Sequence, residues 1–219
     1  MAVSRRRHRA VFLDKDGTLV ENVPYNVDPA LVRLTPGAGP ALRKLAEAGF
    51  RLIVVSNQSG VARGLFPLDA LAAVERRIAE LLEPDGVQLD DYYYCPHHPQ
   101  GCVEPYAVRC GCRKPRPGLL LRGAEEHSVE LDRSWLVGDI LDDVEAGCRA
   151  GCRTILLHSR KSGGGEDGGV ATSGGETEWR PGTCRRPVAL AAELDEAAGL
   201  ILAADRKQEE ERCDAILST

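Results

Sequence analysis

The sequence predicts an α/β fold in which a parallel β-sheet lies between two layers of helices, as in Rossmann-like domains. Short apolar runs alternate with longer segments whose apolar residues recur every three or four positions, which indicates strands alternating with amphipathic helices. The apolar runs lack polar alternation, as expected for strands that are buried on both faces. At 219 residues, 43% of them hydrophobic, the chain is long enough to bury one core. We therefore expect a three-layer α/β/α domain.

Strands and helices are expected in alternation along the chain. The strand-like runs are residues 10–13, 51–55, 135–137 and 154–157, and a last short strand is expected at 187–190. Apolar residues recur every three or four positions in residues 39–48, 68–82, 118–127 and 141–150, which predicts four helices. A closing amphipathic helix is expected at 194–204. Parallel strands joined through helices imply right-handed crossovers.

One catalytic domain is expected over residues 9–204, flanked by two charged ends. Residues 1–8 form a basic arm that we expect to be solvated, and residues 205–219 form a charged tail that we expect to fray. Residues 162–182 are rich in Gly, Ser and Thr and predict a flexible surface loop. No second block is large enough for a cap domain, so any cover over a substrate must come from loops.

The charge balance argues against several classes of partner. Lys and Arg total 28 against 33 Asp and Glu, and the formal net charge of -5 provides no general attraction to nucleic acid or to an anionic membrane. No apolar stretch approaches the roughly 20 residues needed to span a bilayer, and no signal-peptide core follows the basic start. We expect a cytoplasmic monomer that acts on a small substrate.

Two carboxylates follow the first predicted strand, in the motif Asp14-Lys15-Asp16-Gly17-Thr18. The carboxyl ends of parallel strands are where the active sites of open α/β sheets lie. Hydrolysis of a phosphate ester needs a nucleophile, a proton source for the leaving oxygen and cations against the phosphoryl charge. Asp14 could attack phosphorus and form an aspartyl-phosphate, and Asp16 could protonate the departing oxygen and then activate water. Taken alone, the motif is equally consistent with an Asp-Gly turn.

Two further polar elements could hold a phosphoryl group. The second strand ends in Ser56-Asn57-Gln58-Ser59-Gly60, where a hydroxyl and main-chain amides could bind phosphate oxygens, although such clusters are often ordinary loops. Arg113 and Lys114 lie just before a predicted helix. Lys114 would place a positive charge against the phosphoryl group, and Arg113 could bind a second anion of the substrate. An exposed basic turn is the alternative interpretation.

A fourth polar element, Val137-Gly138-Asp139, ends another buried strand. Asp139 could complete an oxygen-rich Mg²⁺ site with Asp14 and the main-chain carbonyl of Asp16. In the helix that follows, we expect Asp143 to support the site from behind and Asp142 to cap the helix. Because the four elements follow strands or precede helices in a regular order, an enzyme is favoured over four unrelated loops.

Cysteine and histidine gather in one loop, at residues 95–112. The pairs Cys95-x-His97 and Cys110-x-Cys112 provide three thiolates and one imidazole, the ligands that a closed tetrahedral zinc site takes. With no open position, such a zinc would be structural and would order a loop that has no core of its own. His98 and Cys102 lie in the same loop and are alternatives that the spacing does not exclude.

The cysteine usage bears on the redox compartment. Eight cysteines in a secreted domain would suggest disulfides, but the crowding of three of them beside two histidines favours metal binding in a reducing compartment. Cys148 and Cys152 have Gly and Ala neighbours, so we expect them to be small buried residues.

The four catalytic motifs together resemble those of the haloacid dehalogenase-like phosphatases. The motifs are Asp14-Lys15-Asp16-Gly17-Thr18, Ser56-Asn57-Gln58-Ser59-Gly60, Arg113-Lys114-Pro115 and Val137-Gly138-Asp139. The cysteine loop is similar to that of the D-glycero-D-manno-heptose 1,7-bisphosphate phosphatase family and its sister histidinol-phosphatase branch. The resemblance spans residues 9–158 and implies a magnesium-dependent phosphatase whose structural zinc is bound by His97 rather than His98.

The resemblance also implies a substrate and the residues that bind it. In the family, the heptose bisphosphate is bound by the loop after the first motif, by the second-motif loop and by the Arg-Lys pair. Carried over to this chain, the substrate-binding residues are Asn22, Tyr25, Asn57, Gln58, Ser59 and Arg113, with Ser56 and Lys114 against the phosphoryl group. On sequence grounds alone, Tyr25 could equally pack in a short flap and Asn22 could be a turn residue.

We therefore hypothesise hydrolysis of the 7-phosphate of D-glycero-D-manno-heptose 1,7-bisphosphate. Family members often have Lys where this chain has Ile140, and the missing cation weakens the assignment of the substrate more than that of the reaction. Hydrolysis of histidinol phosphate or of another small sugar phosphate is the alternative. A binding module without catalysis is a second alternative, against which the intact set of catalytic residues argues.

Overall fold

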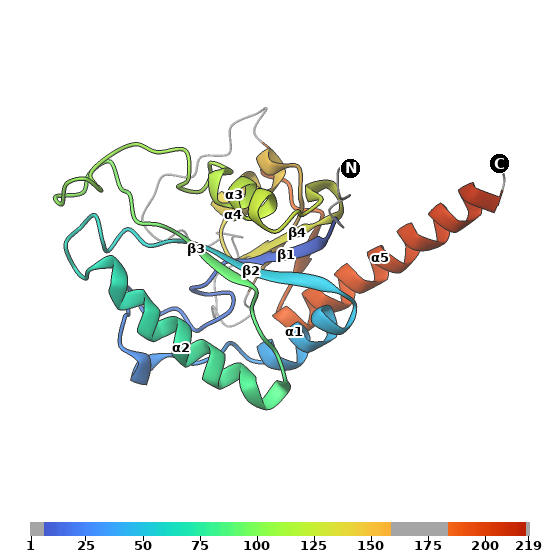
Figure 1. The fold of residues 1–219 in the computed structure, drawn as a ribbon, viewed down its shortest axis with the longest axis horizontal. Helices are drawn as coiled ribbons and strands as arrows, with labels where there is room; N and C mark the ends of the chain where they lie inside the picture. Colours follow the sequence, from blue (N-terminus) through green and yellow to red (C-terminus); the bar gives the residue numbers. More distant parts are fainter. Residues whose placement is uncertain (1–6, 159–183, 218–219) are drawn as a thin grey trace, which may run out of the picture.

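The computed structural model describes residues 7–158 and 184–217. Its sheet has six parallel strands in the order β3-β2-β1-β4-β5-β6, which confirms the predicted parallel sheet (Figure 1). The strands are β1 Arg9–Leu13, β2 Phe50–Asn57, β3 Asp91–Cys95, β4 Trp135–Gly138, β5 Arg153–Leu157 and β6 Ala189–Ala191.

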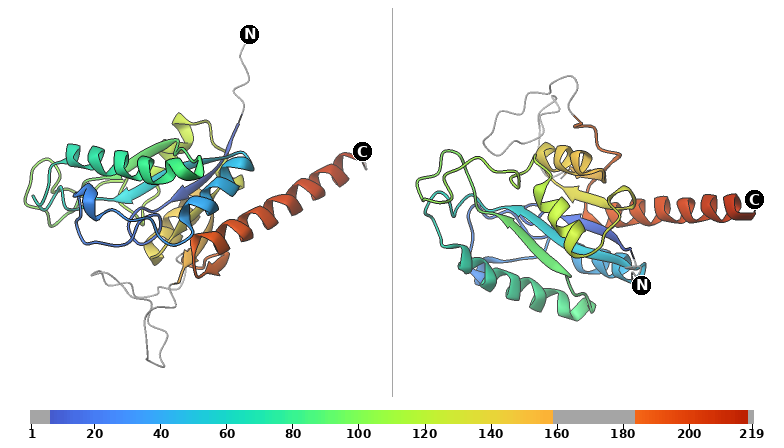
Figure 2. Two further views of the ribbon diagram at one scale, coloured as in Figure 1. Left: turned by 90° about the horizontal axis from the view of Figure 1, so that it is seen from below. Right: turned by 45° about the horizontal axis from the view of Figure 1, so that its top comes forward.

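Helices cover both faces of the sheet and give the predicted three layers (Figures 1 and 2). One face carries α1 Ala38–Glu47, α2 Leu71–Leu82 and the start of α5 Leu194–Leu217, and the other carries α3 Gly118–Glu126 and α4 Leu141–Ala150. Short 3-10 helices lie at η1 Pro29–Leu31, η2 Leu68–Ala70, η3 Glu83–Asp85 and η4 Leu131–Arg133. No second domain interrupts the described ranges.

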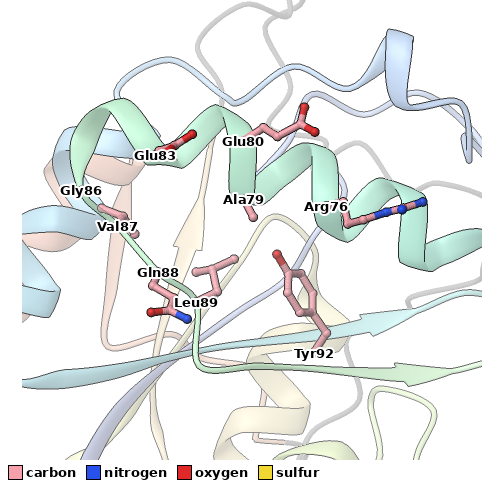
Figure 3. A pocket seen from close by; sticks show the side chains of 9 residues that line it. All are labelled: Arg76, Ala79, Glu80, Glu83, Gly86, Val87, Gln88, Leu89 and Tyr92. Atoms are coloured by element: carbon pink, nitrogen blue, oxygen red, sulfur yellow. The ribbon is translucent and has the colours of Figure 1, made fainter.

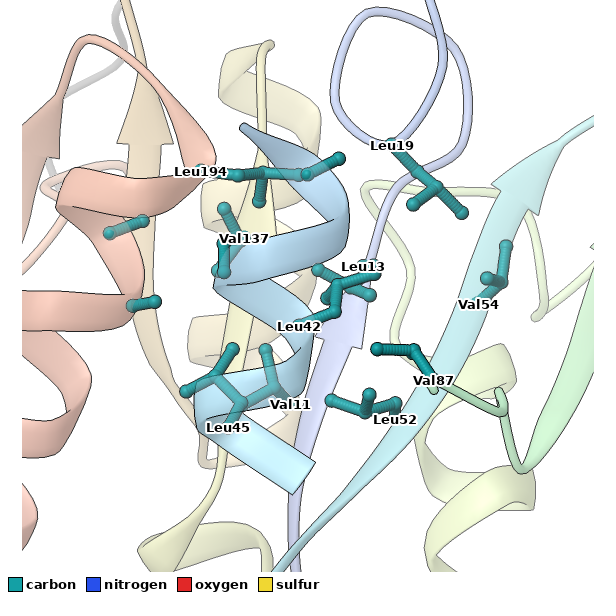
Figure 4. Close-up of a cluster of buried hydrophobic side chains, with 14 of the residues drawn as sticks. Val11, Leu13, Leu19, Leu42, Leu45, Leu52, Val54, Val87, Val137 and Leu194 are labelled. Atoms are coloured by element: carbon teal, nitrogen blue, oxygen red, sulfur yellow. The ribbon is translucent and has the colours of Figure 1, made fainter. Parts of the chain in front are cut away.

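The core lies on both sides of the central strand β1. Val11 and Leu13 face one hydrophobic cluster, in which Leu42 and Leu45 of α1 pack against them (Figure 4). Ala10 and Phe12 face the opposite cluster, which includes residues of α3 and α4. Successive side chains of a strand point to opposite faces, so a strand covered on both sides must be apolar throughout. This is why the predicted strands were recognisable as continuous apolar runs.

The order of the strands creates a switch point beside β1. The chain passes from β1 to β2 on one side, whereas β4 lies against the other side of β1. Leu13 is in register with Val137, and the N–H of Asp14 donates to the carbonyl of Val137 at 2.9 Å. The residues that follow β1 and β4 therefore leave the sheet side by side, at the position where open α/β sheets bind ligands.

Two elements differ from the predictions. Strand β3 was not predicted, although its run Tyr92-Tyr93-Tyr94 has high β propensity. Helix α5 does not end at Ala204 but continues to Leu217 and extends beyond the body of the domain, so the predicted end of this helix at residue 204 is wrong (Figure 1). The residues after Ala204 are mostly good helix formers, and Asp205 forms an ion pair with Arg9 that fixes the helix to the start of β1.

Cys148 also differs from its prediction, whereas Cys152 agrees. Cys152 is buried as expected, but Cys148 is only partly buried and forms a disulfide with Cys184, 36 residues away. Spacing does not reveal such a pairing, because the connectivity of cysteines depends on the fold.

Some predictions fall outside the described residues. The loop expected at 162–182 and residues 1–6 of the basic arm belong to this group, and the domain boundaries stay predictions. None of the helices in the described part of the chain is both long and apolar enough to cross a membrane.

Candidate active site

Asp14 lies at the first position after β1, and its side chain is nearly buried. The amine of Lys114 lies 2.5 Å from its Oδ1. Burial raises the pKa of Asp14 to about 6, opposed by Lys114 and reinforced by the neighbouring carboxylates of Asp143 and Asp16. The predicted nucleophile thus lies at the carboxyl end of the central strand, in contact with a fixed cation.

Lys114 comes from the loop before α3 and is also buried. Its amine donates to Asp14 Oδ1 and to the carbonyl of Val55 at 2.9 Å, and it lies 2.6 Å from Asp143 Oδ1. The amine thus makes two hydrogen bonds and one further ion pair within the core of the site. Although burial disfavours the charged amine, Asp14 and Asp143 raise the pKa of Lys114 above its usual range. Asp143 therefore contacts the amine that holds Asp14, and its supporting role stays a prediction.

Three carboxylates, those of Asp14, Asp139 and Asp143, converge at this point, with one oxygen of each within 4.8 Å of the others. Burial, followed by repulsion from Asp14 and Asp143, raises the pKa of Asp139 to about 7. A single buried amine does not balance three carboxylates. The raised pKa values and the all-oxygen donor set fit a divalent cation such as Mg²⁺.

Gly17 leaves the space that Asp139 occupies. A Cβ atom on Gly17 would lie 2.2 Å from Asp139 Oδ2, and Gly17 has a φ of +86°. Both the close approach and the left-handed backbone require glycine. The sequence motif placed Gly17 at a sharp turn but did not show that this turn borders Asp139.

The carboxylate of Asp16 is held from two directions rather than joining this cluster. Lys15 Nζ donates to Asp16 Oδ1 at 2.6 Å, and Gln58 Nε2 donates to Asp16 Oδ2 at 2.9 Å. The sequence did not predict a role for Lys15. The burial of Lys15 and its contact with Asp16 are not visible from composition or spacing.

The loop after β2 contacts two of the other predicted motifs, through Lys114 and Asp16. Both polar atoms of the Asn57 amide bond to the main chain of Lys114, at 3.0 and 3.1 Å. Ser56 Oγ accepts from Gln58 Nε2 at 3.0 Å, which leaves its own hydroxyl proton free as a donor. Ser59 is partly exposed beside them. The loop positions Lys114 and Asp16, and binding of substrate by Asn57, Gln58 and Ser59 stays a prediction.

The four predicted zinc ligands meet in space. The three sulfur atoms lie 3.3 to 3.5 Å from one another, and His97 Nδ1 lies 3.7 Å from Cys95 Sγ and 3.4 Å from Cys112 Sγ. Zn–S bonds of about 2.3 Å in a tetrahedron separate sulfur atoms by roughly 3.8 Å, so the cluster is close to the required size. Hydrogen bonding with Cys95 lowers the pKa of Cys112 to about 5, which favours the thiolate that binds metals.

The two alternative ligands of this loop lie outside the cluster. His98 Nδ1 accepts from the N–H of Gln100, and its Nε2 lies 3.4 Å from Arg63. Cys102 is exposed, with its sulfur against the carbonyl of Arg63. Arg113 Nη1 reaches the carbonyl of His97 at 3.5 Å. His97 therefore lies within the cluster, whereas His98 and Cys102 do not.

The predicted substrate residues of the flap after β1 are open to solvent. Asn22 is exposed, and Tyr25 is 49% exposed with a φ of +55°. Tyr25 is therefore not the packing residue that was the alternative. Ile140 is partly exposed, and its N–H donates to Asp143 Oδ2 at 3.3 Å.

A separate pocket lies far from these residues, between α2 and the segment that enters β3 (Figure 3). Its lining includes Arg76, Glu80, Val87 and Tyr92, and it shares no residue with the carboxylate cluster. It lies near the amino end of β3, whereas the catalytic motifs lie at the carboxyl ends of the strands. The pocket is therefore not the active site.

Comparison with known proteins agrees with this geometry. The family model described as HAD-hydrolase-like, that is, haloacid dehalogenase-like, matches residues 111–172. The D-glycero-beta-D-manno-heptose-1,7-bisphosphate 7-phosphatase of Rhodopseudomonas palustris is 40% identical over 151 residues, which are 69% of this chain and 84% of that protein. The enzyme of the same name from Escherichia coli K12 is 40% identical over 148 residues, 68% of this chain and 78% of its own length.

A solved structure extends the similarity to the fold. The D,D-heptose 1,7-bisphosphate phosphatase of B. bronchiseptica, determined with magnesium and phosphate, has a TM-score of 0.69 and 28% identity, and the match covers 90% of this chain and 99% of that one. The identity to curated relatives and the share of their length that is covered are both high enough to establish membership. The chain belongs to the haloacid dehalogenase-like hydrolases and, among them, to the family of the heptose-1,7-bisphosphate 7-phosphatases.

Proposed function

We propose that this phosphatase hydrolyses the 7-phosphate of D-glycero-D-manno-heptose 1,7-bisphosphate through a covalent aspartyl-phosphate. The observation that carries the reaction is the contact of Lys114 with Asp14, 2.5 Å apart and buried at the end of β1. A carboxylate that is desolvated, oriented and paired with a cation is suited to attack a phosphorus atom, whose negative charge would otherwise repel it. The names of the relatives support the substrate.

In the first step, an oxygen of Asp14 forms a bond to phosphorus as the bond to the leaving oxygen breaks. Asp16 donates its proton to that oxygen, which departs as the sugar hydroxyl. In the second step, Asp16 takes a proton from water, the water oxygen attacks phosphorus, and Asp14 is released with inorganic phosphate. Lys114 and the hydroxyl of Ser56 stabilise the charge on the phosphoryl oxygens in both steps.

A magnesium ion bound by Asp14, Asp139 and the carbonyl of Asp16 would neutralise charge on the phosphoryl group. The fit of the residues supports this, because Asp14 and Asp139 converge and both have raised pKa values. Asp16 contributes its main chain here, since its carboxylate is bound to Lys15 and Gln58.

The substrate would lie between the flap after β1 and the loop that carries the cysteine cluster. Tyr25 and Asn22 are exposed on the first side, and Arg113, next to Lys114, is available for the distal phosphate on the other. Within the described residues, Arg113 has no carboxylate within 4.0 Å, so a bound anion would supply its counter-charge. Ile140 supplies no cation, and Arg113 would have to bind the second phosphate without a lysine at that position.

A structural zinc ion bound by Cys95, His97, Cys110 and Cys112 belongs to the same proposal. The cluster leads directly into Arg113 and Lys114, so the metal would fix the loop that presents both cations. The cytoplasmic location and the monomeric state stay predictions.

The substrate is tested by initial rates, with Mg²⁺, on both anomers of heptose 1,7-bisphosphate, on histidinol phosphate and on simple sugar phosphates. We expect a heptose bisphosphate to give the highest kcat/KM. Faster turnover of histidinol phosphate would reject the heptose assignment and keep the reaction.

The covalent mechanism is tested by Asp14→Asn, which removes the nucleophile with little change in size. We expect phosphate release to fall to background. The matched control is Asp142→Asn, at the start of α4, which does not contact Lys114 and should retain most of the activity. Phosphate release that survived Asp14→Asn would reject aspartyl catalysis, and a protein inactive on every phosphate ester would favour the non-catalytic alternative.

A further inference from the structure

Lys15 is a buried cation whose charge is directed at Asp16. Its side chain is 2% exposed, whereas that of Asp16 is 30% exposed. Asp16 is its only carboxylate partner within the ranges that the structure describes, at 2.6 Å. The main-chain carbonyl of Lys15 accepts from the N–H groups of Leu19 and Val20, at 3.0 and 2.9 Å. The backbone of Lys15 is thus fixed by the turn, and its amine reaches one oxygen of the proposed acid.

Gln58 holds the other oxygen of Asp16. Its side-chain nitrogen donates to Asp16 Oδ2 at 2.9 Å and to Ser56 Oγ at 3.0 Å, which uses both of its protons. Its main-chain N–H donates to the carbonyl of Cys95 at 2.8 Å. Gln58 is 5% exposed, so neither end of the residue is free to follow a moving carboxylate.

The two contacts determine the direction in which the carboxylate of Asp16 faces. The terminal torsion of an aspartate is broad and, without partners, samples many orientations. Here both oxygens have a buried donor, and the donors come from two different loops that the fold fixes. The more exposed carboxylate is thereby held at the surface of the site, where a leaving oxygen would arrive.

We propose that Lys15 and Gln58 are positioning residues, which act through Asp16 by holding its carboxylate in line with the leaving oxygen. The proposal rests on the reaction at Asp14 and Asp16, and not on the identity of the sugar. Neither residue is needed to neutralise the nucleophile, because Lys114 already contacts Asp14.

The proposal predicts that loss of positioning affects substrates with different leaving groups to different extents. When the P–O bond to a sugar breaks, the departing alkoxide is a strong base, and the proton of Asp16 must reach it as the bond from Asp14 forms. A p-nitrophenolate ion is a weak base and departs with little help from an acid. Loss of positioning therefore slows hydrolysis of an alkyl phosphate much more than hydrolysis of p-nitrophenyl phosphate.

The experiment measures kcat/KM with Mg²⁺ for a sugar phosphate and for p-nitrophenyl phosphate. Lys15→Met and Gln58→Met remove the donors at similar length, and Lys15→Arg keeps a charged donor. For each Met variant we expect kcat/KM on the sugar phosphate to fall about 10- to 100-fold and the aryl-to-alkyl ratio to rise at least about tenfold. Lys15→Arg should recover most of the loss on the sugar phosphate.

A double-mutant cycle with Asp16→Asn separates positioning from structure. If Lys15 acts through Asp16, then Lys15→Met adds no further loss once Asp16 is Asn. Equal losses on both substrates, or a full additional loss in the Asp16→Asn background, would overturn the proposal. Circular dichroism and the Tm establish that each variant is folded. If Lys15→Met does not fold, the Gln58→Met variant tests the proposal by itself.

This outcome is independent of the proposed substrate. If the wild-type enzyme does not hydrolyse heptose bisphosphate, the substrate assignment is rejected. Any alkyl phosphate that the enzyme does hydrolyse can still be compared with p-nitrophenyl phosphate.

Discussion

Removing magnesium and raising the pH should destabilise this protein through its carboxylate cluster. The folded-state pKa of Asp14 is raised from 3.8 to about 6 and that of Asp139 from 3.8 to about 7. A carboxyl group whose pKa is raised by folding binds more protons in the folded than in the unfolded state between those values. Metal-free protein is therefore stabilised below about pH 4 by these groups, and this stabilisation is lost as the pH rises to about 7.

The size of the loss follows from the same values. One pKa unit corresponds to about 1.4 kcal/mol, so Asp14 contributes roughly 3 kcal/mol and Asp139 roughly 4 kcal/mol. Part of the Asp139 contribution is repulsion from Asp14, and Asp139 is partly exposed, so the two contributions do not simply add. We expect a fall of about 3 kcal/mol in the free energy of unfolding between about pH 5 and about pH 7.5.

The assay is urea unfolding of magnesium-free protein at the two pH values, followed by the same measurement with millimolar Mg²⁺. Magnesium is removed by gel filtration without a chelator, so that a metal held by the cysteine cluster would not be stripped. At the higher pH, Mg²⁺ at about 100 times its Kd should restore about 2.7 kcal/mol.

Asp139→Asn is the matched control, because subtracting its pH profile cancels the titrating groups that do not interact with Asp139. We expect the variant to have a shallower pH dependence and a weaker response to Mg²⁺. A wild-type protein that is equally stable at both pH values without Mg²⁺, or one whose difference from Asp139→Asn is zero, would refute the reasoning.

Three further predictions concern single residues. Lys114→Met leaves buried carboxylates unpaired, so urea unfolding should show a loss of about 3–5 kcal/mol at neutral pH, and kcat should fall about 100- to 1,000-fold. Gly17→Ala places a Cβ atom 2.2 Å from Asp139 Oδ2, so a folded but nearly inactive protein with weaker Mg²⁺ binding is expected by titration; full activity would contradict the close approach. Cys110→Ser should lower the zinc content from about one per chain and lower the Tm, whereas Cys102→Ser, outside the cluster, should change neither; a zinc-free yet fully stable wild-type protein would contradict the structural role.

The parts of the fold that the sequence predicted are those in which local pattern and tertiary burial agree. Helix α4 begins at Leu141 and ends at Ala150 as predicted, because its apolar residues follow one face and Gly151 ends it in a left-handed conformation. Strand β3 and the extension of α5 were missed for opposite reasons. The first is an edge strand of aromatic residues without the long apolar run of its neighbours, and the second is a charged helix with little apolar surface to predict it.

The sequence motifs named most residues of the candidate site but did not predict the contacts between them. Asp143 contacts Lys114, as a residue that supports the site would, and His97 lies in the cysteine cluster. The amide of Asn57, expected to bind substrate, makes a contact that was not predicted, because it holds the main chain of Lys114. Cys148, expected to be a buried thiol, is bonded to Cys184. Such contacts join residues far apart in the chain, where spacing carries no information.

The sequence by itself determined the alternation of strands and helices along the chain, apart from β3, and the kinds of chemical groups at the strand ends. It did so because burial on two faces requires continuous apolar runs and because phosphoryl transfer needs particular side chains in a particular order. Only the tertiary structure decided which groups meet. The position of β4 against β1 brings Asp139 to Asp14, and the packing of three loops places Lys114 on the nucleophile and fixes both oxygens of Asp16 between Lys15 and Gln58. These contacts depend on long-range packing, which a pattern along the chain does not encode.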